Sequence, residues 1–396
     1  MTPQLSDRVK NMATSATLAM AAKARELKEA GKDIIGLSLG EPDFTIPEFV
    51  KEAAIKAIQE DFHSYTPVDG YGDLKQAIIT KFKRDNGLSY TPAQIVVSTG
   101  AKQSLANLAQ VLLNEGDEVL LPAPYWVSYA DISKVAGGVP KEIKTSIDND
   151  FKITADELRA AITSKTKLII YSSPCNPSGS VYSKKELRAL ADVLVDYPNI
   201  IVISDEIYEH INFAGDHVSM AEFEDMYDRT VTVNGVSKAY SMTGWRIGYI
   251  GAPEWIAKAC TKMQGQVTSG ANCIAQRATI AALENPPSKI QYMVDAFKER
   301  RKLILGLLSE IPGFKTNEPE GAFYVFPDIS YYFGKTLQGT NINSASDFSL
   351  FLLEHANVAT VTGEAFGDAN CIRISYAASE NDITEAMKRI KEALTH

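Results

Sequence analysis

A lysine and an arginine lie eight residues apart in the stretch from Gly235 to Gly248. Lys238 follows the apolar run 230–234, which is typical of a buried strand, and Arg246 lies in a bend rich in Gly, Ser and Thr. Taken singly, such residues are most often surface charges. Together they place an amine, which can form a Schiff base with an aldehyde, near a guanidinium, which suits a phosphate dianion. Pyridoxal phosphate carries both an aldehyde and a phosphate.

Four other apolar runs are expected to form strands, at residues 94–99, 118–121, 167–171 and 199–204. Helical patterns alternate with these strands, which predicts an α/β fold with a mainly parallel sheet flanked by helices. Gly100, Asn176 and Asp205 come at or shortly after three of the strand ends. Because ligands bind beyond the carboxyl ends of parallel strands, we expect these residues to converge with Lys238.

The segment Gly100-Ala101-Lys102 is typical of a glycine turn followed by a helix start, where free amides and the helix dipole attract a phosphate. It is neither a Walker loop nor a GxGxxG fingerprint, so nucleotide binding has little support. Other candidates have ordinary structural explanations. Trp126, after a proline-rich turn, is equally typical of a core anchor, and Asp205 is equally typical of a helix cap.

Further elements are expected along the chain. Two capping boxes, at Thr154 and Ser183, predict helix starts, and a helical pattern covers residues 73–86. Short strands are expected at residues 34–39, 320–326 and 371–376, and residues 284–287 read as a break. We therefore expect a second domain to begin after this break.

Composition limits the classes of partner. The chain has 396 residues, 45% of them hydrophobic, and is long enough for one large and one smaller domain. A net charge of −9 without a cluster of basic residues argues against nucleic acid or an anionic membrane as the partner. Four cysteines without CxxC pairs or histidine spacing argue against a metal site and against disulfides. No apolar run is long enough to cross a bilayer, and residues 12–22 are too polar for a signal peptide, so we expect a cytoplasmic protein.

The stretch around Lys238 resembles the lysine signature of the class I, fold type I pyridoxal-phosphate-dependent aminotransferases. The resemblance covers nearly the whole chain, and its most specific parts are this stretch, Asp205 with Tyr208, Asn176 and Arg373. It implies a large domain with a mainly parallel sheet and a smaller α+β domain. The implied bounds are an N-terminal arm with part of the small domain at 1–46, the large cofactor-binding domain at 47–285 and the C-terminal small domain at 286–396. Within the family the chain looks like the bacterial-type aspartate aminotransferases, with two supporting blocks at residues 125–129 and 242–246.

The resemblance also implies roles for individual residues. Lys238 would be the catalytic residue, and pyridoxal 5′-phosphate the cofactor. The implied cofactor-binding residues are Tyr65, Gly100, Ala101, Lys102, Trp126, Asn176, Asp205, Tyr208, Ser237, Lys238 and Arg246. The implied substrate-binding residues are Gly40, Trp126, Asn176 and Arg373.

Several of these roles are specific. The backbone N–H groups of residues 100–102 and Arg246 would hold the phosphate, and Trp126 would stack on the ring. Asp205 would keep the ring nitrogen protonated, while Asn176 and Tyr208 would bind the phenolic oxygen.

Two further roles concern the substrate and a second chain. Arg373 would grip the α-carboxylate of the substrate with a bidentate fork, and the backbone at Gly40 would lie against the substrate. Tyr65 would reach the cofactor phosphate of a second subunit, which predicts a homodimer.

The implied reaction transfers the amino group of L-aspartate to 2-oxoglutarate by a ping-pong cycle and gives oxaloacetate and L-glutamate, so the partners are small amino acids and 2-oxo acids. Three alternatives remain: an aminotransferase for aromatic amino acids or prephenate, another pyridoxal enzyme on the same fold, and a ligand-sensing module without catalysis. Two positions depart from aspartate-specific relatives. Gly235 stands where animal-type enzymes have a serine, and Ala13 stands where some bacterial relatives have a lysine.

Overall fold

The computed structural model describes residues 4–395 and contains a central sheet of seven strands in the order β2-β8-β7-β6-β5-β3-β4. β8 is antiparallel to both of its neighbours, and every other pair is parallel. The predicted α/β fold with a mainly parallel sheet is therefore confirmed. The strands are β2 (Ile95–Ser98), β3 (Glu118–Pro122), β4 (Val139–Ile143), β5 (Thr166–Ser172), β6 (Ile201–Asp205), β7 (Thr230–Gly235) and β8 (Gly248–Gly251).

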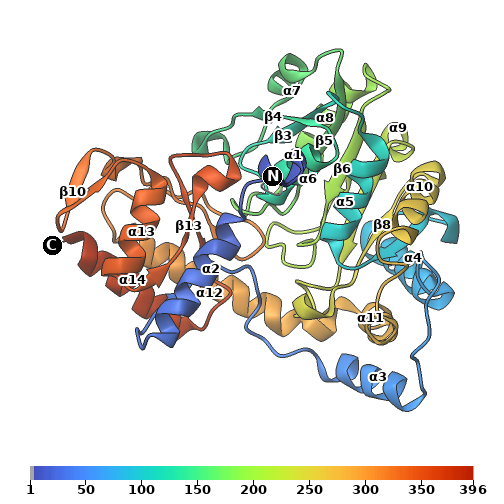
Figure 1. Ribbon diagram of the computed structural model, residues 1–396, viewed down its shortest axis with the longest axis horizontal. Helices are drawn as coiled ribbons and strands as arrows, with labels where there is room; N and C mark the ends of the chain where they lie inside the picture. Colours follow the sequence, from blue (N-terminus) through green and yellow to red (C-terminus); the bar gives the residue numbers. More distant parts are fainter. Residues whose placement is uncertain (1–3, 396) are drawn as a thin grey trace.

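Helices cover both faces of this sheet (Figure 1). Along β5 the side chains of Leu168 and Ile170 pack with those of α5 and α10 on one face, and Ile169 packs with α8 on the other. Burial on both faces explains why these strands are continuous apolar runs in the sequence. The helices of this part are α3 (Glu48–Gln59), α4 (Gly72–Asn86), α5 (Ala101–Leu112), α6 (Ser128–Val135), α7 (Ala155–Ala161), α8 (Lys184–Val195), α9 (Glu224–Tyr227), α10 (Glu254–Gly265) and α11 (Cys273–Glu284).

Local signals set the ends of several helices. The Thr154 and Ser183 side chains accept hydrogen bonds from the backbone N–H groups of Glu157 and Glu186, so both predicted capping boxes are confirmed. The helix expected at residues 73–86 is α4, and it ends at Gly87, whose φ of +67° is the left-handed conformation that glycine adopts without strain.

A second, smaller group of elements lies beside the first, at the left of Figure 1. It contains a three-stranded antiparallel sheet in the order β13-β14-β9, a hairpin β10-β11, and the parallel pair β1-β12. Its elements are α2 (Ala16–Glu29), β1 (Ile35–Gly36), α12 (Gln291–Ser309), β9 (Tyr324–Val325), β10 (Lys335–Leu337), β11 (Thr340–Ile342), α13 (Ala345–His355), β12 (Val358–Ala359), β13 (Val361–Thr362), β14 (Ile372–Ser375) and α14 (Glu380–Thr395). The pairing of β1 with β12 joins the start of the chain to its end.

Two predicted strands are shorter than expected. The run 34–39 forms only β1, because after Gly36 the chain turns into the space between the two groups, where the Ser38 carbonyl accepts a hydrogen bond from Arg373. The run 320–326 forms only β9. The expected break at residues 284–287 separates α11 from the 3-10 turn Pro287–Ile290 and α12.

The first helices bridge the two groups. α1 (Asp7–Lys10) contacts α6 on the larger group, and α2 contacts β12 and β13 on the smaller one (Figure 1). The connection between α1 and α2 therefore passes over the space between them. Within residues 4–395, no helix is both long enough and apolar enough to cross a membrane.

Candidate active site

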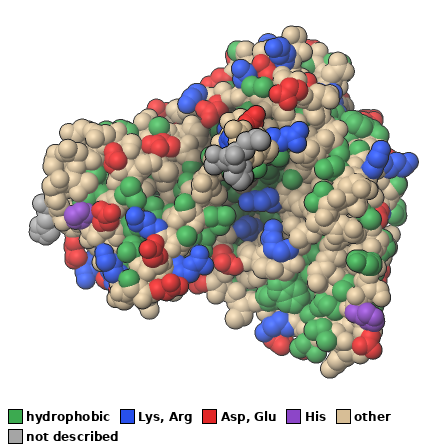
Figure 2. Space-filling model, in the orientation of Figure 1, with side chains coloured by type: hydrophobic (Ala, Val, Ile, Leu, Met, Phe, Trp, Pro, Cys, Tyr) green, Lys and Arg blue, Asp and Glu red, His purple; other side chains and the backbone are tan. Residues whose placement is uncertain are grey.

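A cavity of about 230 Å³ opens beyond the carboxyl ends of β5, β6 and β7, between the two groups of elements. In Figure 2 the same region is a hollow in which Lys and Arg side chains gather. Most of the predicted site residues line it, namely Gly40, Ala101, Lys102, Trp126, Asn176, Asp205, Tyr208, Ser237, Lys238, Arg246 and Arg373. Gly100 lies directly behind the cavity wall, and Tyr65 lies on the outer surface.

The amine of Lys238 is held inside this cavity. Its Nζ donates a hydrogen bond to the Gly40 carbonyl at 2.6 Å. Burial, together with the positive charges of Arg373 and Arg246, lowers the pKa of Lys238 to about 8. About a tenth of the Lys238 side chains are therefore neutral at pH 7 and about half at pH 8. The neutral amine is the form that attacks an aldehyde.

The end of the cavity near α5 is built for an anion. Gly100 precedes α5 with a φ of +82°, and Ala101 and Lys102, the first two residues of the helix, line the cavity. The free amides at a helix start attract an anion. The Arg246 guanidinium packs so closely on Gly100 that a Cβ there would collide with it, and it donates to the Thr243 carbonyl at 2.7 Å. Among residues 4–395 no carboxylate forms an ion pair with Arg246, so its charge is available to a ligand such as a phosphate.

Asp205 lies at the end of β6 and is 4% exposed. Its Oδ2 accepts a hydrogen bond from the Tyr129 hydroxyl at 2.7 Å, and its Oδ1 accepts one from the Ile207 amide at 3.3 Å. Burial raises the pKa of Asp205 to about 6, against the opposing effect of Tyr129. No basic side chain in the described part of the chain forms an ion pair with this carboxylate. Its environment thus suits a cationic ligand group, for example a protonated ring nitrogen.

Arg373 is 2% exposed and also lacks a carboxylate partner within residues 4–395. Its Nη1 donates to Asn176 Oδ1 at 2.9 Å, and its Nη2 donates to the Ser38 carbonyl. The guanidinium lies 4.5 Å from the centre of the Tyr324 ring. A buried, fixed guanidinium of this kind suits a carboxylate ligand.

Trp126 and Lys102 form one wall of the cavity. The Lys102 Nζ lies 4.8 Å from the centre of the Trp126 ring, a cation–π contact. Burial and the charge of Arg246 lower the pKa of Lys102. The expected role of the Lys102 backbone N–H in holding the phosphate stays a prediction, and Lys102 lines the cavity.

Sequence reasoning missed several residues of the site. Tyr129, which donates a hydrogen bond to Asp205, lies in the block 125–129, but the resemblance implied no role for it. Tyr324 belongs to a strand of the smaller group. Ser15 and Thr17 reach the cavity from the start of α2. The sequence offers a signal only for Tyr129, because it lies close to Trp126 in the chain. Tyr324, Ser15 and Thr17 come from segments far away along the chain.

The cavity fits pyridoxal phosphate on three independent features. The aldehyde requires an amine with a lowered pKa, which Lys238 provides. The ring nitrogen requires a buried carboxylate without a basic partner, which Asp205 provides. The phosphate requires a guanidinium without an ion-pair partner at a helix N-terminus, which Arg246 provides.

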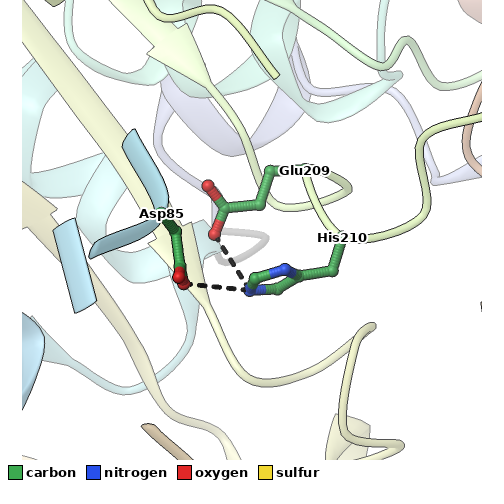
Figure 3. Close-up of side chains that lie close together, drawn as sticks. All are labelled: Asp85, Glu209 and His210. Atoms are coloured by element: carbon green, nitrogen blue, oxygen red, sulfur yellow. Dashed lines mark ion pairs between the residues drawn. The ribbon is translucent and has the colours of Figure 1, made fainter. Parts of the chain in front are cut away.

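Another cluster of titratable side chains lies behind the turn that follows β6 (Figure 3). His210 Nε2 is 3.3 Å from Glu209 Oε1 and 3.7 Å from Asp85 Oδ2. This spacing suits a metal ion, but the fully buried ammonium of Lys81 already contacts Glu209 Oε1, and Arg84 pairs with Asp85. The cluster is therefore an internal ion-pair network that anchors the turn.

Comparisons with known proteins agree with this geometry. The family model described as Aminotransferase class I and II matches residues 32–390. A bifunctional aspartate aminotransferase and glutamate/aspartate-prephenate aminotransferase from Petunia hybrida is 47% identical over 395 residues, covering 98% of this chain and 82% of that protein. An aspartate aminotransferase from Bacillus sp. (strain YM-2) is 47% identical over 388 residues, covering 98% of each chain. The crystal structure of the aspartate aminotransferase from Rhizobium meliloti has a TM-score of 0.96 and 43% identity, covering 99% of each chain.

The family match and the relatives span nearly the whole length of this chain, and they agree with the amine, the acid and the two guanidinium groups of the cavity. This chain belongs to the class I and II aminotransferases, and its cofactor is pyridoxal 5′-phosphate.

Proposed function

We propose that this protein transfers the amino group of L-aspartate to 2-oxoglutarate and gives oxaloacetate and L-glutamate. The observation that carries the proposal is that Lys238, Asp205 and Arg373 line one cavity, each with its reactive group free of an oppositely charged partner within the described residues. Relatives with 47% identity over nearly the whole chain are named aspartate aminotransferases, which supports aspartate as the donor.

The residues around the cavity divide the binding of the cofactor among them. Lys238 holds the aldehyde carbon, and Asp205 holds the ring nitrogen. The phosphate is held by Arg246, by Ser237 and by the amides at the start of α5, Gly100, Ala101 and Lys102. Trp126 covers the ring, and Asn176 and Tyr208 bind the phenolic oxygen. When bound, the cofactor supplies an electron sink for the pair of electrons left by the breaking Cα–H bond.

The substrate is oriented by the chain itself. Arg373 binds the α-carboxylate, and its contact with Asn176 fixes the guanidinium plane relative to the ring side of the cavity. The carbonyl of Gly40 accepts a hydrogen bond from Lys238, which directs the amine into the space where the substrate lies. Once the amino group of the substrate has displaced Lys238 from the aldehyde carbon, the freed amine in its neutral form would take the proton from the substrate Cα as a general base. Its pKa of about 8 suits this task near neutral pH.

We also infer a homodimer with shared active sites. Tyr65 is 97% exposed and lies beside residues 268–273 on the outer surface, not in the cavity of its own chain. An exposed aromatic hydroxyl at this place is free to reach the phosphate of a neighbouring subunit. The homodimer and the role of Tyr65 rest on this exposure and on the resemblance.

The remaining proposals concern domains and location. We keep the boundaries 1–46, 47–285 and 286–396, supported by the pairing of β1 with β12 and by the turn before α12. A cytoplasmic location is supported by four free cysteines. Cell fractionation with an antibody tests the location directly.

A second candidate activity uses prephenate as the amino acceptor. One relative at 47% identity is named for both aspartate and prephenate. Prephenate and 2-oxoglutarate share the 2-oxo acid group that Arg373 binds and differ in the distal part. Rates with each acceptor, measured with L-aspartate as the donor, separate the two activities, and a panel of aromatic donors tests the aromatic alternative.

The visible spectrum of the purified protein tests the central proposal. We expect a Schiff-base band that shifts toward the pyridoxamine form when L-aspartate is added and returns with 2-oxoglutarate. Initial rates at several substrate concentrations should give parallel lines in double-reciprocal plots, as a ping-pong cycle requires. Lys238→Ala should abolish the band, while Lys289→Ala, which changes an exposed lysine, should keep it. A band that ignores aspartate would contradict the proposed donor, and the lack of any band would contradict the role of Lys238.

A further inference from the structure

Two buried tyrosines, one from each group of elements, meet at the edge of the cavity. Tyr208 lies in the turn after β6, and Tyr324 lies in β9. Their hydroxyl oxygens are 2.6 Å apart, and their rings meet edge to face at 5.8 Å. Among residues 4–395, each hydroxyl has only the other as a hydrogen-bond partner. Both tyrosines line the cavity.

The direction of this hydrogen bond follows from a count of protons. A tyrosine hydroxyl has one proton to donate and two lone pairs that accept. If the Tyr208 proton is donated to the phenolic oxygen of the cofactor, as the proposed function requires, Tyr208 can only accept from Tyr324. We propose that Tyr324 is a positioning residue whose hydroxyl donates to Tyr208, so that the Tyr208 hydroxyl donates into the cavity. This inference rests on the proposed function.

The surrounding charges favour the same direction. Burial raises the pKa of Tyr208 well above its ordinary value. Burial also raises the pKa of Tyr324. The Arg373 guanidinium opposes the rise at both hydroxyls, but the Asp205 carboxylate adds to the rise at Tyr208 alone. The better acid of a hydroxyl pair is the better donor, which assigns the donor role to Tyr324. The other charged groups that face Tyr208 are Asp205 from β6 and Lys238, whose Nζ lies 5.8 Å from the Tyr208 ring centre.

The backbone of Gly40 keeps the Tyr324 hydroxyl in place. A Cβ at Gly40 would collide with this hydroxyl oxygen, so only glycine leaves room for it. The Tyr324 ring also lies face-on beneath the Arg373 guanidinium. Tyr324 therefore links the residue that binds the substrate carboxylate to the residue that binds the phenolic oxygen.

Removing one oxygen atom tests the link. In Tyr324→Phe, Tyr208 loses the donor that polarises its own O–H group, so it becomes a weaker donor to the cofactor oxygen. When the anionic form of the phenolic oxygen is less well stabilised, the proton next to this oxygen is lost only at higher pH. We expect the pH at which the visible band of the loaded enzyme changes to rise by roughly half a unit. Tyr208→Phe should raise it further, and the double variant should match Tyr208→Phe alone. Tyr332→Phe, a buried tyrosine outside the cavity lining, should leave it unchanged.

Replacing Tyr324 with 3,5-difluorotyrosine provides a test that keeps the hydroxyl and the packing. The fluorines make the hydroxyl a stronger donor, so the transition should move to lower pH. An unchanged transition in both Tyr324 variants, or shifts of Tyr208→Phe and Tyr324→Phe that simply add, would overturn the inference. These outcomes are distinct from failure of the proposed function, in which wild-type protein forms no visible band with pyridoxal phosphate.

Discussion

At the scale of single residues, the Asp205 carboxylate conflicts with its surroundings in the cofactor-free protein. Its pKa of about 6 exceeds the ordinary value of 3.8, so the folded protein holds the ionised group at a cost above pH 6. Two pKa units correspond to about 3 kcal/mol. We expect cofactor-free Asp205→Asn to gain about 1–3 kcal/mol in unfolding free energy at pH 8, measured by urea titration.

The sign of this effect is set by the raised pKa. Between pH 3.8 and 6 the folded protein binds a proton that the unfolded chain releases, so the gain in Asp205→Asn should be smaller at pH 5 than at pH 8. Asp216→Asn, which changes an exposed acid nearby in the chain, is the control and should show no such trend. A loss of stability in Asp205→Asn at pH 8 would contradict the argument. The same variant should lose most of its activity, because the ring nitrogen loses its anionic partner.

The Arg373 guanidinium provides a second prediction at this scale. Lysine keeps the charge but cannot form the fork that binds a carboxylate while also holding Asn176 and the Ser38 carbonyl. We expect Arg373→Lys to lower kcat/KM for amino acids about 100-fold, equivalent to one charged hydrogen bond of about 3 kcal/mol, mostly through KM. Arg389→Lys alters an arginine on α14 that pairs with Asp33, and it should leave the kinetics unchanged. Equal losses in both variants would show a general effect of the substitution.

The sequence predicted the residues whose neighbours in the chain carry a recognisable pattern. Lys238 and Arg246 share one stretch, and Asp205 ends an apolar strand, so their convergence follows from strand order alone. Tyr324 could not be predicted in this way, because its partner Tyr208 is 116 residues away and neither side chain shows periodicity. Such contacts depend on how the smaller group packs against the larger one.

At the scale of elements, the ion-pair network in Figure 3 connects α4 to the turn that carries Asp205 and Tyr208. Lys81 on α4 contacts Glu209, and Asn86 joins both, accepting from Lys81 at 2.7 Å and donating to Glu209 at 2.6 Å. Burial alone would raise the pKa of Glu209, but the charges of Lys81, His210 and His217 together outweigh burial and lower the pKa. Asp205 and Tyr208 line the cavity, and Glu209 and His210 belong to the network, so this one turn contacts both.

This network predicts strong energetic coupling between the charges of Lys81 and Glu209. Removing one partner of a buried ion pair leaves the other charge uncompensated and costs about 3–5 kcal/mol. We expect Lys81→Met and Glu209→Gln each to destabilise the protein by this amount, and the double variant to be more stable than either single one. Urea unfolding of all four proteins measures the coupling. The exposed pair Arg159–Asp196, 3.0 Å apart, is the control and should couple by less than about 1 kcal/mol. Additive effects at Lys81 and Glu209 would contradict the prediction.

The sequence did not predict β4, and it predicted β1 and β9 as longer strands. β4 is an edge strand whose residues are mostly exposed, so it lacks the apolar run that marks β3 or β5. β1 and β9 are two residues long, and the chain after β1 continues to Gly40 in the lining of the cavity. Hydrophobic patterns report burial in regular elements, and these segments are regular only briefly.

At the scale of the whole molecule, the mainly parallel sheet followed from the alternation of strands and helices, but the antiparallel direction of β8 did not. A tight return from β7 through the Lys238 stretch reverses the chain, and apolar content alone does not reveal direction. The pairing of β1 with β12 was not predicted; the resemblance implied only that residues 1–46 contribute to the small domain.

The exposure of Tyr65 leads to a prediction about the assembled molecule. If its hydroxyl serves the site of a partner subunit, a dimer of one Tyr65→Phe subunit and one Lys238→Ala subunit has one site with both residues intact and one with neither. We expect this heterodimer, purified through two different tags after co-expression, to bind one cofactor with wild-type affinity and to show about half of the activity of the wild-type dimer per dimer. If Tyr65 acted within its own chain, no intact site would form, and the cofactor affinity would stay at the weakened Tyr65→Phe value. Tyr292 is also an exposed tyrosine, and it lies outside the surface hollow of residues 63–66 and 268–273. Tyr292→Phe is therefore the control and should bind the cofactor normally in any pairing with an intact Lys238.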